Sequence, residues 1–150
     1  MRASRVMTRN VTCIAPDVSL DRAWSLMGRL AVRHLPVVFA GRLVGVVSDR
    51  DLLRRGIVVE GGALAFPPLA VGEAMTPHPV SCQASVTVAT VASLMLEHRI
   101  DSVPIVTARD ELVGLVTSTD LLELLTAPER ESAPLPFTFE LETVDGRAVA

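Results

Sequence analysis

The chain has 150 residues, 49% hydrophobic and 21% charged, which fits one folded unit of the usual ~100–200 residues and excludes disorder for most of its length. All 14 basic residues are arginine, and 17 acidic residues bring the net charge to −3, which argues against general nucleic-acid binding. No run is apolar enough to span a bilayer and no apolar segment follows the N-terminal arginines, so we expect a cytoplasmic protein without a secretory signal or a membrane partner.

The first sixty residues alternate between short strands and helices. We predict a strand over 12–15 and a helix over 19–30, where apolar residues recur at helical spacing and Asp17 is the expected cap. Two strands follow over 35–39 and 43–47, and a second helix begins near Asp49. We assign residues 1–60 to a first repeat. Residues 61–73, which are rich in Gly and Pro, are assigned to a linker.

The second half of the chain repeats the first. An offset of 68 residues places Met7-Thr8 on Met75-Thr76, and an offset of 69 places Asp51-Leu52-Leu53 on Asp120-Leu121-Leu122. The equivalent elements are a strand over 80–83, a helix over 87–98 capped by Ser85, strands over 103–107 and 112–117, and a helix from Ser118. Residues 74–126 are therefore a second repeat, and we predict an α+β fold of two pseudo-symmetric β-α-β-β-α repeats. Residues 127–150 form a Pro-rich tail with a strand-like alternation over 137–143.

A hydroxyl and a carboxylate recur at the end of the last strand of each repeat. Ser48 precedes Asp51 by three residues, and Thr117 precedes Asp120 by three. A turn from strand to helix exposes backbone N–H groups that suit phosphate, and a carboxylate there can accept hydrogen bonds from a ribose diol. The same spacing also makes a helix capping box, so a ligand site and a purely structural cap are both open interpretations.

These residues together resemble a tandem pair of CBS domains, called a Bateman module. The resemblance covers roughly residues 4–125 and rests on the Val6-Met7-Thr8 and Ala74-Met75-Thr76 starts, the strands that contain Pro36 and Pro104, and the GVVSDRDLL and GLVTSTDLL ends. It implies two repeats packed through their sheets, pairing of two modules into a homodimer, and adenine nucleotides or other adenosyl ligands bound in two clefts between the repeats. It implies regulation rather than catalysis, and no catalytic cofactor.

The resemblance also assigns residues to the two clefts. In each cleft, one repeat binds the phosphate and ribose, and the other repeat contributes apolar residues that contact the adenine. The first cleft combines Ser48, Arg50 and Asp51 with Val80, Ile100 and Asp101. The second combines Thr117, Thr119 and Asp120 with Thr12, Val32 and Arg33.

The two clefts differ in the residues just before each Pro-containing strand. Arg33 and His34 lie on the phosphate side of the Ser48 cleft in this scheme, whereas Asp101 and Ser102 lie there in the Thr117 cleft. Because an arginine attracts phosphate and a carboxylate repels it, we predict that a phosphorylated ligand such as AMP or ATP prefers the Ser48 cleft. The other cleft is expected to stay empty or to take a less charged ligand such as S-adenosylmethionine.

Our first hypothesis is a ligand sensor that signals through dimer geometry or through a protein partner. The alternative is a ligand-free dimerisation or protein-interaction module. An enzyme and a DNA-binding protein are weaker hypotheses, because no nucleophile lies near a base and the net charge is negative.

Five further side chains have open interpretations. His34 and His98 lack partners at metal-ligand spacing, so we expect no metal site. Cys13 and Cys82 are expected to be buried thiols, with a disulfide or redox switch as the minor alternative. Trp24 is equally suited to a dimer contact and to core packing.

Overall fold

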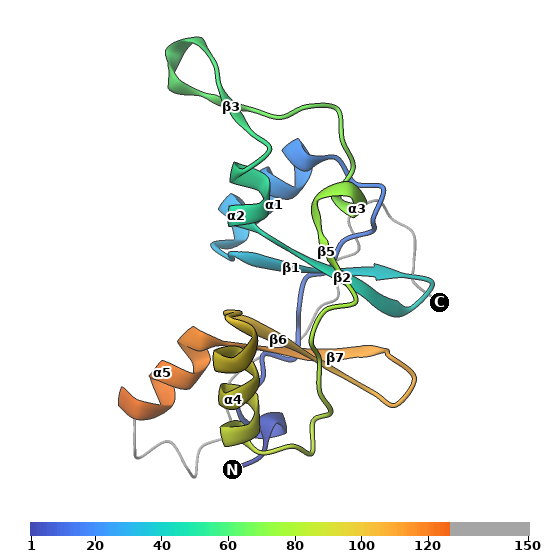
Figure 1. The fold of residues 1–150 in the computed structure, drawn as a ribbon, viewed down its shortest axis with the longest axis vertical. Coiled ribbons are helices and arrows are strands. Elements are labelled where there is room, and N and C mark those ends of the chain that lie inside the picture. Colours follow the sequence, from blue (N-terminus) through green and yellow to red (C-terminus); the bar gives the residue numbers. More distant parts are fainter. Residues whose placement is uncertain (127–150) are drawn as a thin grey trace. The chain divides into compact units, whose positions relative to one another are not determined.

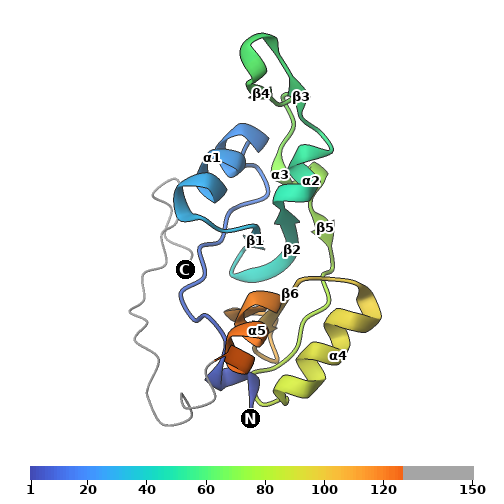
Figure 2. The same ribbon diagram turned by 90° about the vertical axis from the view of Figure 1, so that its left-hand side faces the viewer.

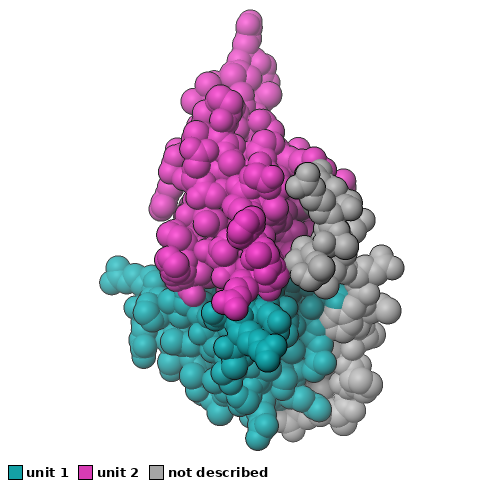
Figure 3. Space-filling view, turned by 90° about the vertical axis from the view of Figure 1, so that its right-hand side faces the viewer, with its two compact units in different colours: residues 1–11, 80–141 teal, residues 12–79, 142–150 magenta. Residues whose placement is uncertain are grey.

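The computed structural model describes residues 1–126, so the tail and its expected strand over 137–143 lie outside the described residues. Two compact units are present (Figure 3). Unit 1 contains residues 1–11 and the described residues from 80 onward, and unit 2 contains residues 12–79. The boundaries of these units differ from those of the predicted repeats, which stay a prediction, because residues 1–11 group with the second half of the chain and residues 61–79 group with the first.

Unit 2 contains the helix, hairpin and helix predicted for the first repeat. Helix α1 (Leu20–Leu30) precedes strands β1 (His34–Phe39) and β2 (Arg42–Ser48), and α2 (Asp49–Leu53) follows them (Figure 1). The chain then forms β3 (Ile57–Val58), the 3₁₀ turn η2 (Glu60–Gly62), β4 (Leu64–Ala65), α3 (Val71–Ala74) and β5 (Thr76–Pro77). The β3–β4 hairpin projects beyond α2 in two views (Figures 1 and 2).

Unit 1 repeats this arrangement. It begins with the 3₁₀ turn η1 (Ala3–Arg5) and continues with α4 (Val88–His98), β6 (Ser102–Val106), β7 (Leu112–Thr117) and α5 (Ser118–Thr126). Both hairpins are antiparallel and carry an irregularity at the same place, between Val37 and Val38 and between Ile105 and Val106. The shared irregularity supports the duplication inferred from the sequence.

Two details of the sequence prediction are wrong. The strands expected over 12–15 and 80–83 are single parallel bridges, Ile14 to Val37 and Cys82 to Ile105. The helix caps are Ser19 and Thr87 rather than Asp17 and Ser85, because each hydroxyl accepts the backbone N–H three residues later. The predicted caps lie two residues before the observed caps, and the helices begin one residue after those, at Leu20 and Val88.

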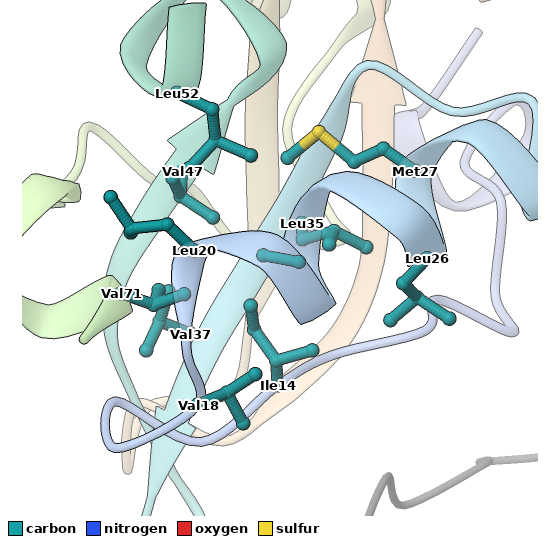
Figure 4. Close-up of a cluster of buried hydrophobic side chains, with 11 residues drawn as sticks. Ile14, Val18, Leu20, Leu26, Met27, Leu35, Val37, Val47, Leu52 and Val71 are labelled. Carbon is teal, nitrogen blue, oxygen red and sulfur yellow. The ribbon is translucent and has the colours of Figure 1, made fainter. Parts of the chain in front are cut away.

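The core of unit 2 lies between α1, α2 and the β1–β2 hairpin. Its eleven buried members are aliphatic or Met (Figure 4): Ile14, Val18, Leu20, Ala23, Leu26, Met27, Leu35, Val37, Val47, Leu52 and Val71. Trp24 is partly buried against this cluster, with its ring centroid 5.7 Å from that of Phe66. Its contacts among the described residues therefore favour core packing over a dimer contact.

The Met-Thr segment at the start of each repeat pairs with the hairpin of the other repeat. In unit 2, β5 pairs with β2, so that Thr76 lies opposite Val46. In unit 1, Thr8 and Leu115 exchange two backbone hydrogen bonds of 2.9 Å. Thr8 and Thr76 are equivalent in sequence, as are Val46 and Leu115. Residues from the start of the chain therefore pack with the second repeat, and residues 69–77 pack with the first.

The same exchange extends to the short helical turns. Val71 and Gly72 at the start of α3 donate their N–H groups to the carbonyls of Val18 and Pro16, at 2.7 and 2.8 Å. In unit 1, Ala3 donates to Val86 at 2.8 Å, and Ser4 donates to Ala84 at 3.1 Å. In each unit, residues from the start of the other repeat therefore supply both a strand contact and a helical-turn contact.

Glycine is required where the exchanged strand meets the hairpin. A Cβ on Gly45 would overlap the Met75 sulfur and lie 3.0 Å from the Thr76 carbonyl oxygen. A Cβ on Gly114 would lie 2.6 Å from the Met7 sulfur. These close approaches let the exchanged Met-Thr strand lie directly on the hairpin.

We expect Gly45→Ala to lower the free energy of unfolding by about 1–3 kcal/mol in urea denaturation, because the added methyl group must displace Met75 or the strand that carries it. Adding Met75→Ala removes the overlapping side chain. The double variant should then be more stable than the sum of the two single losses predicts. Strictly additive losses would contradict a direct clash between these residues.

Candidate functional site

The Ser48 turn, residues 48–51, joins β2 to α2. The Ser48 hydroxyl donates to Asp51 Oδ2 at 2.8 Å, and the Ser48 N–H donates to the same oxygen at 2.9 Å. The Asp51 N–H returns a bond to the hydroxyl at 3.1 Å. The carboxylate is thus held in one orientation by Oδ2. Within residues 1–126, its Oδ1 accepts no hydrogen bond.

The Thr117 turn, residues 117–120, repeats this geometry between β7 and α5. The Thr117 N–H and hydroxyl donate to Asp120 Oδ2 at 2.6 and 2.7 Å, and the Asp120 N–H lies 3.3 Å from the hydroxyl oxygen. All four side chains are half-buried. The capping interaction expected as an alternative therefore exists in both units, and the second carboxylate oxygen of each Asp accepts no hydrogen bond from residues 1–126.

The residues before each Pro-containing strand lie beside their own turn. His34 is the register partner of Ser48, and the Arg33 carbonyl accepts the Asp49 N–H at 2.9 Å. In unit 1, Ser102 pairs with Thr117 and the Asp101 carbonyl accepts the Ser118 N–H at 2.9 Å. These residues therefore lie beside the turn of their own repeat, while their predicted place on the phosphate side of a cleft stays a prediction.

The expected free N–H groups are absent from the start of α2. Asp49 donates to Arg33, Arg50 donates to the Asp49 carboxylate at 2.8 Å, and Asp51 donates to Ser48. The interpretation of this turn as a backbone phosphate cradle is therefore wrong. The sequence feature that could have indicated this is Asp49, whose carboxylate accepts the Arg50 N–H in place of a phosphate. The equivalent residue in the second repeat is Ser118. At the Ser48 turn, only side chains are left to hold a phosphate.

The two turns differ in charge. Arg33 and Arg50 are exposed at the Ser48 turn and offset Asp49 and Asp51, so that the formal charge there is zero with His34 neutral. At the Thr117 turn, the charged residues at the matching positions are Asp101 and Asp120, a formal charge of −2. An anion is therefore favoured at the Ser48 turn relative to the Thr117 turn.

The remaining predicted site residues divide between the units. Thr12 and Val32 belong to unit 2 with the Ser48 turn, and Val80 and Ile100 belong to unit 1 with the Thr117 turn, as does the exposed Thr119. Val32 and Ile100 each follow a residue in the left-handed conformation that ends a helix. The combination of residues from both units into one cleft stays a prediction.

The cysteines are both free thiols, Cys13 buried and Cys82 partly buried. Burial raises the pKa of both above the ordinary value, with the backbone hydrogen bond of Cys13 opposing that shift in part. Raised thiol pKa values disfavour the reactive thiolate at neutral pH. Within residues 1–126, no three His, Cys, Asp or Glu side chains gather as metal ligands would.

Comparison with known proteins identifies the class. The CBS domain family matches residues 3–57 and 71–127. The chain therefore belongs to the CBS domain family and carries two CBS domains in tandem, as the resemblance in the sequence implied.

Two relatives differ in how much of their length matches this pair of CBS domains. It is 34% identical over 115 residues to the CBS domain-containing protein YhcV of Bacillus subtilis, covering 77% of this chain and 79% of that one. It is 31% identical over 120 residues to inosine-5'-monophosphate dehydrogenase of Korarchaeum cryptofilum, covering 80% of this chain but 23% of the dehydrogenase. The chain thus spans about a quarter of the dehydrogenases that it matches.

Solved structures share the fold. CBSX2, solved in complex with AMP, is 28% identical with a TM-score of 0.75, over 86% of this chain and 99% of that one. The CBS domain pair of MJ0100, solved with 5'-methylthioadenosine and S-adenosyl-L-methionine, is 22% identical with a TM-score of 0.73, over 86% and 98%. The α+β fold of paired CBS repeats is confirmed.

The helices of the two units are short. Among residues 1–126, no helix is both long and apolar enough to cross a membrane.

Proposed function

We propose that this protein is a regulatory module that binds an adenine nucleotide or another adenosyl ligand. The observation that carries the proposal is the pair of turns in which a hydroxyl fixes an Asp through Oδ2 and leaves Oδ1 without a partner among the described residues. A fixed carboxylate can accept hydrogen bonds from a ribose diol without reordering its own side chain. AMP in the structure of CBSX2, a relative with the same fold, supports this choice of ligand.

Each proposed site combines one turn with residues from the other repeat. Ser48, Arg50 and Asp51 would hold the ribose and phosphate in the first, with an adenine wall from Val80, Ile100 and Asp101. Thr117, Thr119 and Asp120 would do so in the second, opposite Thr12, Val32 and Arg33. The hydrogen bonds that join Ser48 to Asp51 and Thr117 to Asp120 within each unit support this assignment.

A phosphorylated ligand should prefer the Ser48 turn. Because its backbone N–H groups are already engaged, phosphate affinity there depends on the guanidinium groups of Arg33 and Arg50. Arginine binds phosphate through charge-assisted, often bidentate hydrogen bonds. The negative Thr117 turn suits a ligand without phosphate, such as S-adenosylmethionine.

Binding would be reported to other proteins through a change in dimer geometry or through a protein partner. The proposal places this regulation in the cytoplasm, where the two free thiols would stay reduced. It is a sensor role and not a catalytic one. A ligand could shift the conformation only by its differential affinity for the two states.

A ligand-free interaction module is the second candidate. One observation favours it: Asp51 and Asp120 both complete helix capping boxes. Stabilising the helix start is a sufficient role for an Asp at these positions without any ligand.

Isothermal titration calorimetry and thermal unfolding with AMP, ATP, adenosine and S-adenosylmethionine test the proposal. We expect saturable binding of at least one ligand and a rise in Tm. Absence of heat and of any Tm shift at millimolar concentration of all four would contradict the sensor function and favour the interaction module.

A further inference from the structure

The β3–β4 hairpin is a two-stranded sheet that extends beyond α2 (Figures 1 and 2). The Val59 N–H donates to the Ala63 carbonyl at 2.9 Å, and Val58 lies opposite Leu64. Because bonded and non-bonded pairs alternate between antiparallel strands, the N–H and carbonyl of Val58 point away from β4. No other strand within residues 1–126 pairs with this outer edge of β3.

Strand β3 is apolar and exposed on both of its faces. Ile57, Val58 and Val59 are 64%, 74% and 39% exposed, and successive side chains of a strand point to opposite faces. A hairpin of two strands is only marginally stable in water, and an exposed apolar edge strand favours pairing with a further strand. A third strand on β3 would pair its backbone groups and cover part of this apolar surface.

The base of the hairpin is fixed to the rest of unit 2. The Arg55 guanidinium donates to the Glu73 carbonyl at 3.2 Å, and Phe66, just after β4, packs against the ring of Trp24. These contacts hold the hairpin at its base, so a strand can reach the outer edge of β3 without disturbing the core of the unit.

The sequence beyond α5 contains one segment suited to this edge. Residues 137–143 alternate between apolar and polar side chains, as a strand with one apolar face does. In a strand, Phe137, Phe139 and Leu141 would share that face. The two phenylalanines are half of the four in the chain, so this face gains much from leaving water.

Charge favours one direction for such a strand. Glu140 and Glu142 lie in the second half of the segment, and the exposed Arg54 and Arg55 directly precede β3. An antiparallel strand brings the glutamates toward these arginines, whereas a parallel strand brings them toward Glu60 in the turn. Opposite charges on neighbouring strands stabilise their pairing and like charges oppose it.

We propose that residues 137–143 add to β3 of the same chain as an antiparallel third strand. Ten residues, 127–136, join α5 to this segment and span about 33 Å when fully extended. A segment tethered within reach of its site binds at a high effective concentration, which favours docking within one chain. This contact is separate from the proposed ligand binding, which calorimetry measures independently.

Amide hydrogen exchange of Val58, measured by NMR on the full-length chain, tests the proposal. Docking pairs the outward N–H and should slow its exchange by about tenfold or more. Phe139→Asp places a charge on the apolar face and should return the exchange to the rate of an unpaired amide. Thr138→Asp is the matched control, because it adds the same charge on the opposite face and should change the rate by less than about twofold.

Two results would overturn the third strand. One is fast exchange of the Val58 N–H in the unmodified chain, and the other is an equal loss of protection in Phe139→Asp and Thr138→Asp. Thermal unfolding should show that both variants are folded.

A mixing experiment identifies the chain that supplies the strand. Isotope-labelled Phe139→Asp keeps an intact β3, and unlabelled Val58→Pro keeps an intact tail but lacks the outward N–H. In an equimolar mixture, the Val58 N–H of the labelled chain should stay unprotected. Recovery of its protection would show that the strand comes from a second copy and would overturn docking within one chain.

Discussion

Asp51→Ala is expected to remove most of the thermal stabilisation that a phosphorylated adenosine ligand confers. At a ligand concentration of about 100 Kd, binding raises the free energy of unfolding by roughly 2.7 kcal/mol. Loss of a charge-assisted hydrogen-bond acceptor costs about 1.5–3 kcal/mol of binding, or roughly 10–100-fold in Kd. The stabilisation in the variant should therefore fall to about 1.4 kcal/mol or less. The measurement is the ligand-dependent change in Tm, not the Tm itself.

Glu73→Ala controls for the loss of a helix cap. Its carboxylate accepts the Ala70 N–H at 2.9 Å at the start of α3, which is the same kind of capping bond outside the proposed ligand-binding residues. Both variants should lose about 1 kcal/mol of stability without ligand. Only Asp51→Ala should lose the ligand effect. Equal ligand responses in the two variants would show that Asp51 acts only as a cap.

Asp120→Ala distinguishes the two turns. It should preserve most of the response to AMP or ATP, because the arginines that favour phosphate lie at the Ser48 turn. A response to AMP that disappears with Asp120→Ala and persists with Asp51→Ala would reverse the proposed order of the sites.

Leu52→Ala is expected to lower the free energy of unfolding by about 3 kcal/mol, within the usual range of about 2–5. Leu52 has no exposed surface and joins α2 to the core of unit 2 (Figure 4). Its loss leaves a cavity beneath the short helix that carries Asp51. The measurement is urea unfolding without ligand.

Ile57→Ala is the matched control, because Ile57 is a similar aliphatic side chain that is 64% exposed in β3. Its effect should stay within about 0.5 kcal/mol. Similar losses in the two variants would mean that Leu52 does not pack as the structure shows.

Much of the fold could be predicted because the spacing of apolar residues indicates the same helices and strands in both repeats of the sequence. The helix predicted over 19–30 is observed as Leu20–Leu30, and the strand predicted over 112–117 has those bounds. The hydroxyl and carboxylate of each turn were predicted to be neighbours from their spacing alone. These features are local, so the nearby sequence largely determines them.

Other features depend on contacts that spacing does not encode. The sequence suits Trp24 equally to a dimer contact and to core packing, because its spacing does not reveal that Phe66, in the predicted linker over 61–73, packs against its ring. The phosphate cradle expected at α2 failed because one side chain, Asp49, occupies a backbone N–H. An alignment of the chain with itself showed that Thr8 and Thr76 are equivalent, but it could not show which repeat each one joins.

The exchanged strands have a consequence for the origin of the chain. In this chain, the Met-Thr strand of each repeat pairs with the hairpin of the other repeat and not with its own. Two separate single-repeat chains could form the same strand pairing only by domain swapping, which depends on protein concentration. Joining the two copies makes the exchange intramolecular: β2 of the first repeat pairs with Thr76–Pro77 from the start of the second, and Leu115 of the second repeat pairs with Thr8 from the start of the first. Gene fusion in this fold would therefore convert a pairing between molecules into a pairing within one chain.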